Sequence, residues 1–167
     1  MTDARAIHLA DYQPFSHLVD RVALTFDLSP RATRVRARLQ MRPNPARGTG
    51  LDLRLDGEGL RLVSLMVDGR AVSAQPDDTG LTIPAADLPD APFVLETEVE
   101  IAPEGNTALE GLYMSRGMYC TQCEAEGFRK ITFYPDRPDV MSRFTVRVNG
   151  AHPVLLSNGN LVDQGPG

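Results

Sequence analysis

The 167-residue sequence contains no tryptophan, only 6% aromatic residues and only two cysteines. So few aromatic side chains leave little material for a platform on which bases or sugar rings could stack. Cys120 and Cys123 are also too few for a disulfide framework. With 42% hydrophobic and 23% charged residues, the composition is nevertheless that of a globular protein. We therefore expect a folded domain that needs neither disulfides nor a stacking surface.

Positive charge is scarce as well. The 17 Lys and Arg residues are outnumbered by 22 Asp and Glu residues, which gives a net charge of −5, whereas binders of nucleic acids or anionic membranes show basic patches. No run approaches the roughly 20 apolar residues that a membrane span requires. The first eleven residues contain no apolar signal core. The sequence thus predicts no nucleic-acid partner, no membrane partner and a cytoplasmic location.

Alternating apolar and polar residues dominate the sequence, which is the pattern of half-buried β-strands. The alternation is clear in the segments 22–28, 35–41, 51–56, 93–101 and 144–148. Because one face of each strand is polar, antiparallel sheets with a solvent-exposed face are favoured over a parallel sheet covered on both sides. Between two further apolar runs, the dipeptide at 68–69 is Asp-Gly, which predicts a tight hairpin.

These patterns predict a single all-β domain over residues 1–167, a saddle-like sandwich of antiparallel sheets. Helical periodicity never lasts beyond about two turns, so we expect only short helical turns near 85–88 and 124–130. A helix content above about one quarter would contradict this prediction. Two strands carry opposite charges on their polar faces, and these solvated faces can pair across the sheet: Arg34, Arg36, Arg38 and Arg42 against Glu96, Glu98 and Glu100.

Residues 110–144 depart from the alternation of a sheet, and a Cys-x-x-Cys pair, Cys120 and Cys123, lies near their centre. As half of a zinc site the pair would need further ligands, and the three histidines of the chain are isolated in the sequence. A redox pair of this spacing belongs in a βαβ unit, which the all-β pattern does not provide. Two packed, reduced thiols are the favoured interpretation.

Thr121 and Glu124 have the spacing of a capping box, in which the threonine caps a helix and the glutamate occupies its third position. In this interpretation Glu124 closes a short helical turn through Ala125 and Glu126, and its role is purely structural. The same two residues also belong to a longer motif, and the two interpretations stay open at this point.

The longer motif resembles that of the aminopeptidase N family, the bacterial branch of the gluzincin zinc metallo-aminopeptidases, in its N-terminal domain. It consists of Thr121, Glu124, Phe128-Arg129, Tyr134-Pro135, Asp136 and Pro138. Two further stretches are also similar to the bacterial members. One is Glu-Gly-Leu-Tyr-Met, which begins at Glu110, and the other is Pro-Val-Leu-Leu-Ser-Asn-Gly-Asn, which ends at Asn160. Residues 17–101 match mostly in strand pattern and spacing. The resemblance covers nearly the whole chain.

The resemblance implies a substrate-binding role for two residues, Glu124 and Gln122. In the family, the glutamate reaches into the catalytic cleft and helps to bind the α-ammonium group of the peptide, and the glutamine lines the pocket for the N-terminal side chain. A carboxylate suits this task because an ammonium group offers three donors and a full charge. The partner implied for this chain is therefore the N-terminus of a peptide.

The resemblance also implies what the chain does not contain. The family's zinc site needs a His-Glu-x-x-His helix and a further glutamate, and neither that motif nor the family's Gly-x-Met-Glu-Asn segment occurs here. We expect no catalytic residue, no metal ligand and no cofactor in this chain, with zinc bound by the catalytic domain of the parent enzyme. The chain is expected to be an N-terminal domain that is truncated at its C-terminal end and inactive alone.

Two consequences of such a truncation are expected at the surface. One is an exposed apolar patch where the missing catalytic domain would dock, and the other is an open edge strand near Leu161-Val162, so that the fragment could self-associate. The alternative function is a stand-alone β-sandwich that serves as a binding or interaction module.

The remaining notable residues are predicted to have structural roles. Arg129 is expected to form an ion pair with Asp136 or Glu126. The tyrosines of the 110–144 segment are expected to pack with one end in solvent: Tyr113, Tyr119 and Tyr134. The histidines are expected to lie on the surface or in loops: His8, His17 and His152.

Overall fold

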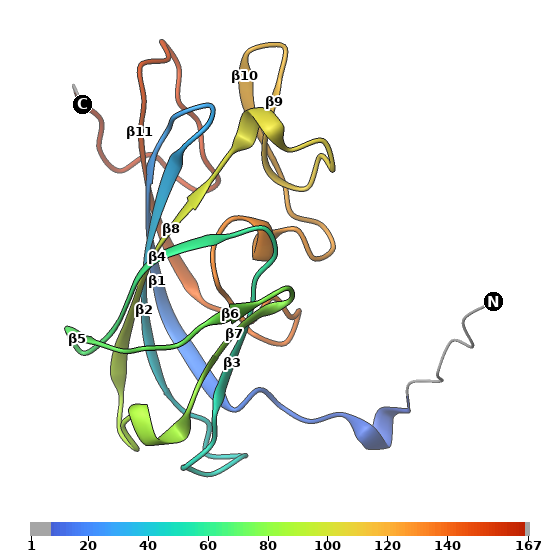
Figure 1. Ribbon diagram of the computed structural model, residues 1–167, viewed down its shortest axis with the longest axis vertical. Helices are drawn as coiled ribbons and strands as arrows, with labels where there is room; N and C mark the ends of the chain where they lie inside the picture. The colour runs from blue at the N-terminus through green and yellow to red at the C-terminus, as the bar shows by residue number, and fades with distance from the viewer. Residues whose placement is uncertain (1–7, 166–167) are drawn as a thin grey trace.

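The protein is described by a computed structural model for residues 8–165; residues 1–7 and 166–167 of the predicted domain lie outside this range. Its largest sheet has six strands and runs the length of the molecule (Figure 1). The strand order is β11 (Arg143–Asn149), β1 (His17–Asp27), β2 (Thr33–Pro43), β8 (Phe93–Ile101), β4 (Arg61–Val67) and β5 (Arg70–Ala71).

Two smaller sheets lie on the same side of the large one (Figure 1). A three-stranded sheet has the order β3 (Leu53–Asp56), β7 (Gly80–Ile83) and β6 (Pro76–Asp77). A two-stranded hairpin consists of β9 (Gly111–Ser115) and β10 (Met118–Gln122). The all-β fold predicted from the alternation is confirmed, with 43% of residues 8–165 in strands and 8% in helical turns.

The core lies between the inner face of the large sheet and the three-stranded sheet. The apolar members of the alternating segments point inward, as their period of two requires, and Ile131 and Phe133 add to the core from the segment after β10. The most completely buried aliphatic side chains come from both layers: Val22, Val35, Leu39, Leu95 and Val99 from the large sheet, and Leu53, Leu55, Leu81 and Ile83 from the small one.

One strand pair differs from the predicted antiparallel arrangement, because β11 runs parallel to β1 at the edge of the large sheet. Alternation reports which face of a strand is buried and carries no information about the direction of its neighbour. A β-bulge between Val19 and Arg21 interrupts the register of β1 with β2. Ser142, just before β11, donates a hydrogen bond from its hydroxyl to the carbonyl oxygen of Val19 at 2.8 Å.

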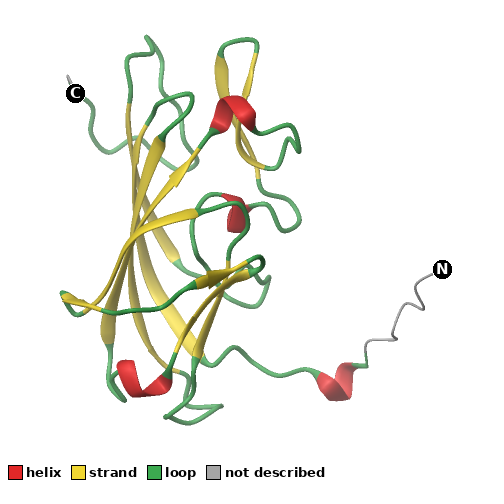
Figure 2. Ribbon diagram, viewed as in Figure 1, coloured by secondary structure: helices red, strands yellow, loops and turns green. Residues whose placement is uncertain are grey.

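The helical segments in residues 8–165 are short 3-10 turns (Figure 2): η1 (Leu9–Asp11), η2 (Ala85–Asp87), η3 (Pro103–Gly105) and η4 (Phe128–Lys130). Turn η2 confirms the prediction near 85–88, and η4 occupies the end of the turn predicted at 124–130. None of the helical turns in this range is long and apolar enough to cross a membrane.

The predicted edge strand near Leu161-Val162 is wrong. These residues lie in the irregular segment after β11, and their side chains are 76% and 88% exposed. The two edges of the large sheet are β5 and β11, and β11 has a hydrogen-bonded neighbour, β1, on one side in the described chain. Apolar residues at 161–162 suggested a strand, but a strand forms only where another strand is available to pair with it.

Candidate functional site

The loop that carries Gln122 and Glu124 connects the hairpin strand β10 to the turn η4. The hairpin pairs Met118 with Ser115 at its tip and Gln122 with Gly111 at its base. Its tip turns through Arg116 and Gly117, with φ values of 50° and 83°, which is the left-handed conformation that two-residue hairpin loops require. Gln122 is therefore fixed at the end of a strand, and Glu124 follows in the loop.

Residues 122–127, which we call the Glu124 loop, form a tight turn. The side-chain amide of Gln122 donates to the carbonyl oxygen of Glu124 at 3.4 Å, and the Gly127 N–H donates to the carbonyl oxygen of Cys123 at 2.9 Å. The peptide bond between Glu124 and Ala125 is cis. Both predicted site residues, Gln122 and Glu124, are exposed, and the structure brings them together in this loop.

Gly127 allows the Glu124 loop to close upon itself. A Cβ atom at this position would lie 2.4 Å from the carbonyl oxygen of Gln122 and 2.9 Å from the Cα atom of Cys123. Both contacts are with backbone, so a larger residue could be accommodated only by moving the loop. The shape of the Glu124 loop therefore depends on a residue without a side chain.

The capping-box interpretation of Thr121 and Glu124 is wrong. Thr121 lies within β10, paired with Leu112 of β9, and is not at a helix start. The turn that follows, η4, begins after Gly127 and receives no side-chain hydrogen bond at its N-terminus. The strand continues to Gln122, so the extended backbone of the hairpin takes precedence over the local capping spacing.

The carboxylates near the loop differ in whether they have a cationic partner. Glu126 approaches Arg129 at 3.3 Å, and Glu58 and Glu110 approach Lys130 at 2.9 and 3.4 Å. Within residues 8–165, Glu124 is the one glutamate that forms no ion pair. The remaining glutamates are all paired: Glu58, Glu96, Glu98, Glu100, Glu104, Glu110 and Glu126. The nearby cations are already engaged, which leaves the carboxylate of Glu124 free for a cation from outside the domain.

Arg129 forms ion pairs with both predicted partners. Its Nε atom lies 3.1 Å from Asp136 Oδ2, and its Nη2 atom lies 3.3 Å from Glu126 Oε2. The structural role predicted for this arginine is confirmed. The two side chains of the Arg129–Asp136 pair are only 17% and 12% exposed, so this pair belongs to the interior under the loop.

Cys120 and Cys123 are free thiols, and Cys123 packs against the core. Burial raises the pKa of the Cys123 thiol, with Asp136 contributing in the same direction, so that its thiol form is favoured over the reactive thiolate. Within residues 8–165 no group of three or more His, Cys, Asp or Glu residues is arranged to hold a metal ion. The interpretation as packed, reduced thiols agrees with these positions.

Tyr113 and Tyr119 are half-buried, as predicted, whereas the predicted end in solvent is wrong for Tyr134. Tyr134 is buried and its hydroxyl lies 2.8 Å from Ser142 Oγ, while Tyr119 is half-buried and meets the His152 ring edge-on at 5.2 Å. His8 and His152 are exposed. The prediction for His17 is wrong, because this residue begins β1 on its buried face and is only 3% exposed. The bulge in β1 lies between His17 and the alternation that starts at Val22. The alternation therefore does not show on which face of the strand His17 lies.

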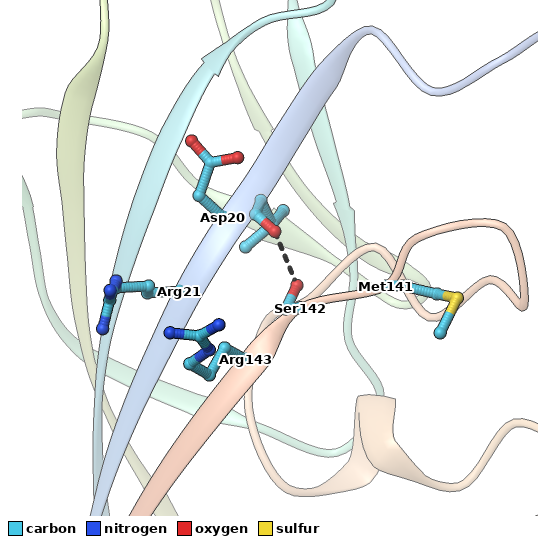
Figure 3. Close-up of a pocket in the computed structure, with 6 residues that line it drawn as sticks. Asp20, Arg21, Met141, Ser142 and Arg143 are labelled. Carbon is cyan, nitrogen blue, oxygen red and sulfur yellow. Dashed lines mark hydrogen bonds between the residues drawn. The ribbon is translucent and has the colours of Figure 1, made fainter.

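A shallow depression lies between β1 and the start of β11 (Figure 3), and no sequence pattern predicts it. Arg21 and Arg143, which are register partners across the two strands, lie side by side at its rim. Asp20 at the same place pairs with Arg42 at 3.0 Å. Neither Gln122 nor Glu124 lines this depression, and the bond from Ser142 to Val19 shows it to be the seam where β11 joins β1.

The family model of the peptidase M1 N-terminal domain matches residues 62–166. The chain belongs to this family. Aminopeptidase N of Caulobacter vibrioides is 54% identical over 166 residues, which cover 96% of this chain and 19% of that protein. Aminopeptidase N of Escherichia coli is 44% identical over 158 residues, covering 93% and 18%. The resemblance to the aminopeptidase N family is confirmed.

Among solved structures, that of Legionella pneumophila aminopeptidase A in complex with aspartic acid superimposes with a TM-score of 0.84. It is 33% identical, and the match covers 93% of this chain and 19% of that one. The peptidase M1 N-terminal domain described here thus spans about a fifth of the length of these relatives.

Proposed function

We propose that this chain is the substrate-anchoring domain of a zinc aminopeptidase, an enzyme that releases single residues from peptide N-termini. In this proposal Glu124 binds the α-ammonium group of the substrate, and Gln122 lines the pocket for its first side chain. The observation that carries it is the exposed carboxylate of Glu124, the one glutamate without an ion pair among residues 8–165. Relatives named aminopeptidase N support the assignment.

The chemistry of the Glu124 loop suits an exopeptidase. A carboxylate without an internal partner can accept short, charge-assisted hydrogen bonds from an ammonium group. An N-acetylated or internal peptide offers no such charge, so its binding would leave the carboxylate unpaired once the site is closed from water. Glu124 would thereby select substrates with a free N-terminus.

Catalysis itself is assigned to other parts of the enzyme. The donor groups among residues 8–165 do not fit a zinc ion, since no three His, Cys, Asp or Glu residues converge. Zinc and the general base would come from the catalytic domain of the parent protein, which we place in the cytoplasm. We expect the 167-residue chain alone to hydrolyse no aminoacyl-anilide and to bind no stoichiometric zinc.

The proposal is tested by Glu124→Gln in the enzyme that carries this domain. The substitution keeps the shape of the side chain and removes its charge. Truncating one partner of a buried charge pair costs about 2–5 kcal/mol, which corresponds to roughly a 30-fold to several-thousand-fold loss of kcat/KM on peptides with a free N-terminus. Because a second glutamate from the catalytic domain shares the ammonium in the related enzymes, as the resemblance implies, we expect the lower end of this range.

Glu110→Gln is the matched control, since Glu110 directly precedes β9 of the same hairpin and its side chain is 54% exposed and already paired with Lys130. We expect it to change kcat/KM little, because exposed ion pairs contribute about 0–1 kcal/mol. Gln122→Ala should instead alter the preference among N-terminal side chains. Normal kinetics in the Glu124→Gln enzyme, with zinc content and melting temperature retained, would contradict the proposed role.

A further inference from the structure

We propose that Arg129 is a positioning residue for Glu124, a role that rests on the proposed function of that glutamate. Arg129 lies in turn η4, five residues after Glu124, and touches no group that we assign to the substrate. It would act by holding the Glu124 loop in the shape that presents the free carboxylate to the α-ammonium group.

Asp136 holds Arg129 through three hydrogen bonds. The Arg129 backbone N–H donates to Asp136 Oδ2 at 3.0 Å, its Nε–H donates to the same oxygen at 3.1 Å, and its Nη2 donates to the Asp136 carbonyl at 3.2 Å. Both side chains are more than four-fifths buried. A planar guanidinium with several fixed donors suits such a multiple contact, whereas a lysine would have a single ammonium group for it.

The pair is in turn fastened to the three-stranded sheet. The Asp136 N–H donates to Asp56 Oδ2 at 2.9 Å, and the carbonyl oxygen of Arg129 accepts from the Glu58 N–H at 3.0 Å. Asp56 and Tyr134 exchange two backbone hydrogen bonds, of 2.9 and 3.1 Å. Arg129 is therefore anchored to a layer of the core rather than to another surface loop.

From this anchor Arg129 reaches back into the Glu124 loop. Its Nη2 atom lies 3.3 Å from the carboxylate of Glu126, two residues after Glu124. The other end of the loop is closed by the hydrogen bond from the Gly127 N–H to the Cys123 carbonyl oxygen. By engaging Glu126, Arg129 also leaves Glu124 as the free carboxylate of the loop.

A double-mutant cycle between Arg129→Gln and Glu124→Gln in the whole enzyme tests this coupling. We expect Arg129→Gln to lower kcat/KM on free-amine peptides about 10- to 100-fold, mainly through a higher KM, because a displacement of about 1 Å in a positioned group can cost about 100-fold. In the Glu124→Gln background the same substitution should cause little further loss. Residues that act through one another are non-additive in this way.

Lys130→Gln is the control for a general loss of stability. Lys130 is the next residue in the same turn and forms ion pairs with Glu58 and Glu110, neither of which lies in the Glu124 loop. We expect Lys130→Gln to leave KM within about twofold of wild type, even where its melting temperature falls. A buried charge left unpaired can prevent folding, so Arg129→Lys is the second variant, with a smaller loss that also vanishes in the Glu124→Gln background.

The outcomes separate the two proposals. If Glu124→Gln has normal kinetics, the proposed function fails. If Glu124→Gln is impaired while the Arg129 variants are normal, or impaired to the same extent in both backgrounds, the role of Arg129 fails and the proposed function stands. An equal rise of KM in Lys130→Gln would likewise overturn the positioning role.

Discussion

At the residue scale, His17 is an ionisable side chain on the buried face of a strand whose other buried residues are apolar. Its ring lies on the buried face of β1, meets the Phe93 ring edge-on at 5.8 Å, and places Nδ1 at 2.9 Å from Ser16 Oγ. No carboxylate of the described chain forms an ion pair with it. Burial lowers the pKa of His17 below its ordinary 6.5, so the folded protein holds the ring in its neutral form.

This burial predicts a loss of stability toward acid. As the pH falls through about 6.5, the ring takes up a proton in the unfolded chain, while the folded protein resists until its lower pKa is reached. The contribution is therefore complete above pH about 6.5 and is lost between that pH and the folded pKa. Urea unfolding at pH 7 and pH 5 should show a smaller decline for His17→Gln than for wild type. His152→Gln, at an exposed ring, should retain the wild-type decline; an unchanged decline in His17→Gln would refute the prediction.

At the element scale, strands β2 and β8 match their charges across the solvent-exposed face of the large sheet. Arg34, Arg36 and Arg38 are register partners of Glu100, Glu98 and Glu96. Arg34 makes two of the ion pairs, at 2.9 Å to Glu98 and 3.0 Å to Glu100. Since the pairs are partly exposed, each contributes about 0–1 kcal/mol and is weakened by salt.

Arg34→Gln removes both pairs and should therefore lower the free energy of unfolding by up to about 2 kcal/mol at low salt, and by less in 1 M NaCl. Arg21→Gln is the matched control. Arg21 lies in β1 on the same face of the large sheet as Arg34, and it has no ion pair among residues 8–165. Because Arg21→Gln removes no ion pair, we expect it to lower the free energy of unfolding less than Arg34→Gln does. Equal destabilisation by the two substitutions, or an effect of Arg34→Gln that is insensitive to salt, would contradict the pairing argument.

The strands were predictable from sequence where one face of an element is buried over its whole length. Residues 93–101 alternate without interruption and form β8 with the same bounds. His17 was placed wrongly because a bulge shifts the phase of β1, and the parallel pairing of β11 was missed because direction leaves no mark on alternation. Glu124 was identified by family resemblance alone. What distinguishes it is a carboxylate without a cationic partner, and this property can be recognised only once the positions of the neighbouring cations in the fold are known.

At the scale of the whole molecule, apolar side chains are unusually exposed after the last strand. Val154, Leu156, Leu161 and Val162 are between 68% and 89% exposed. In addition, β11 has a hydrogen-bonded neighbour on one side in the described chain. An open strand edge and exposed apolar residues are features through which chains associate.

The isolated 167-residue chain should accordingly self-associate as its concentration rises. Light scattering is expected to show a mean mass that increases with concentration, and replacing Leu156 and Val162 by aspartate should shift this increase to higher concentration. The matched control is Ala151→Asp, which adds a charge at an exposed position next to β11 without removing a large apolar side chain. A strictly monomeric wild-type chain at high concentration would contradict the prediction.

The parallel seam between β1 and β11 has a consequence for the order in which the protein is assembled. Arg21 faces Arg143 across this seam, so the two strands meet over a separation of more than a hundred residues in the chain. Contacts of such long range slow folding, because the intervening chain must be closed into a loop before they form. On the ribosome, β1 can pair with β2 early, but its other edge must wait until the residues of β11, Arg143–Asn149, have emerged. Completion of the large sheet is thus a late event in biosynthesis, set by topology and not by the strength of any single contact.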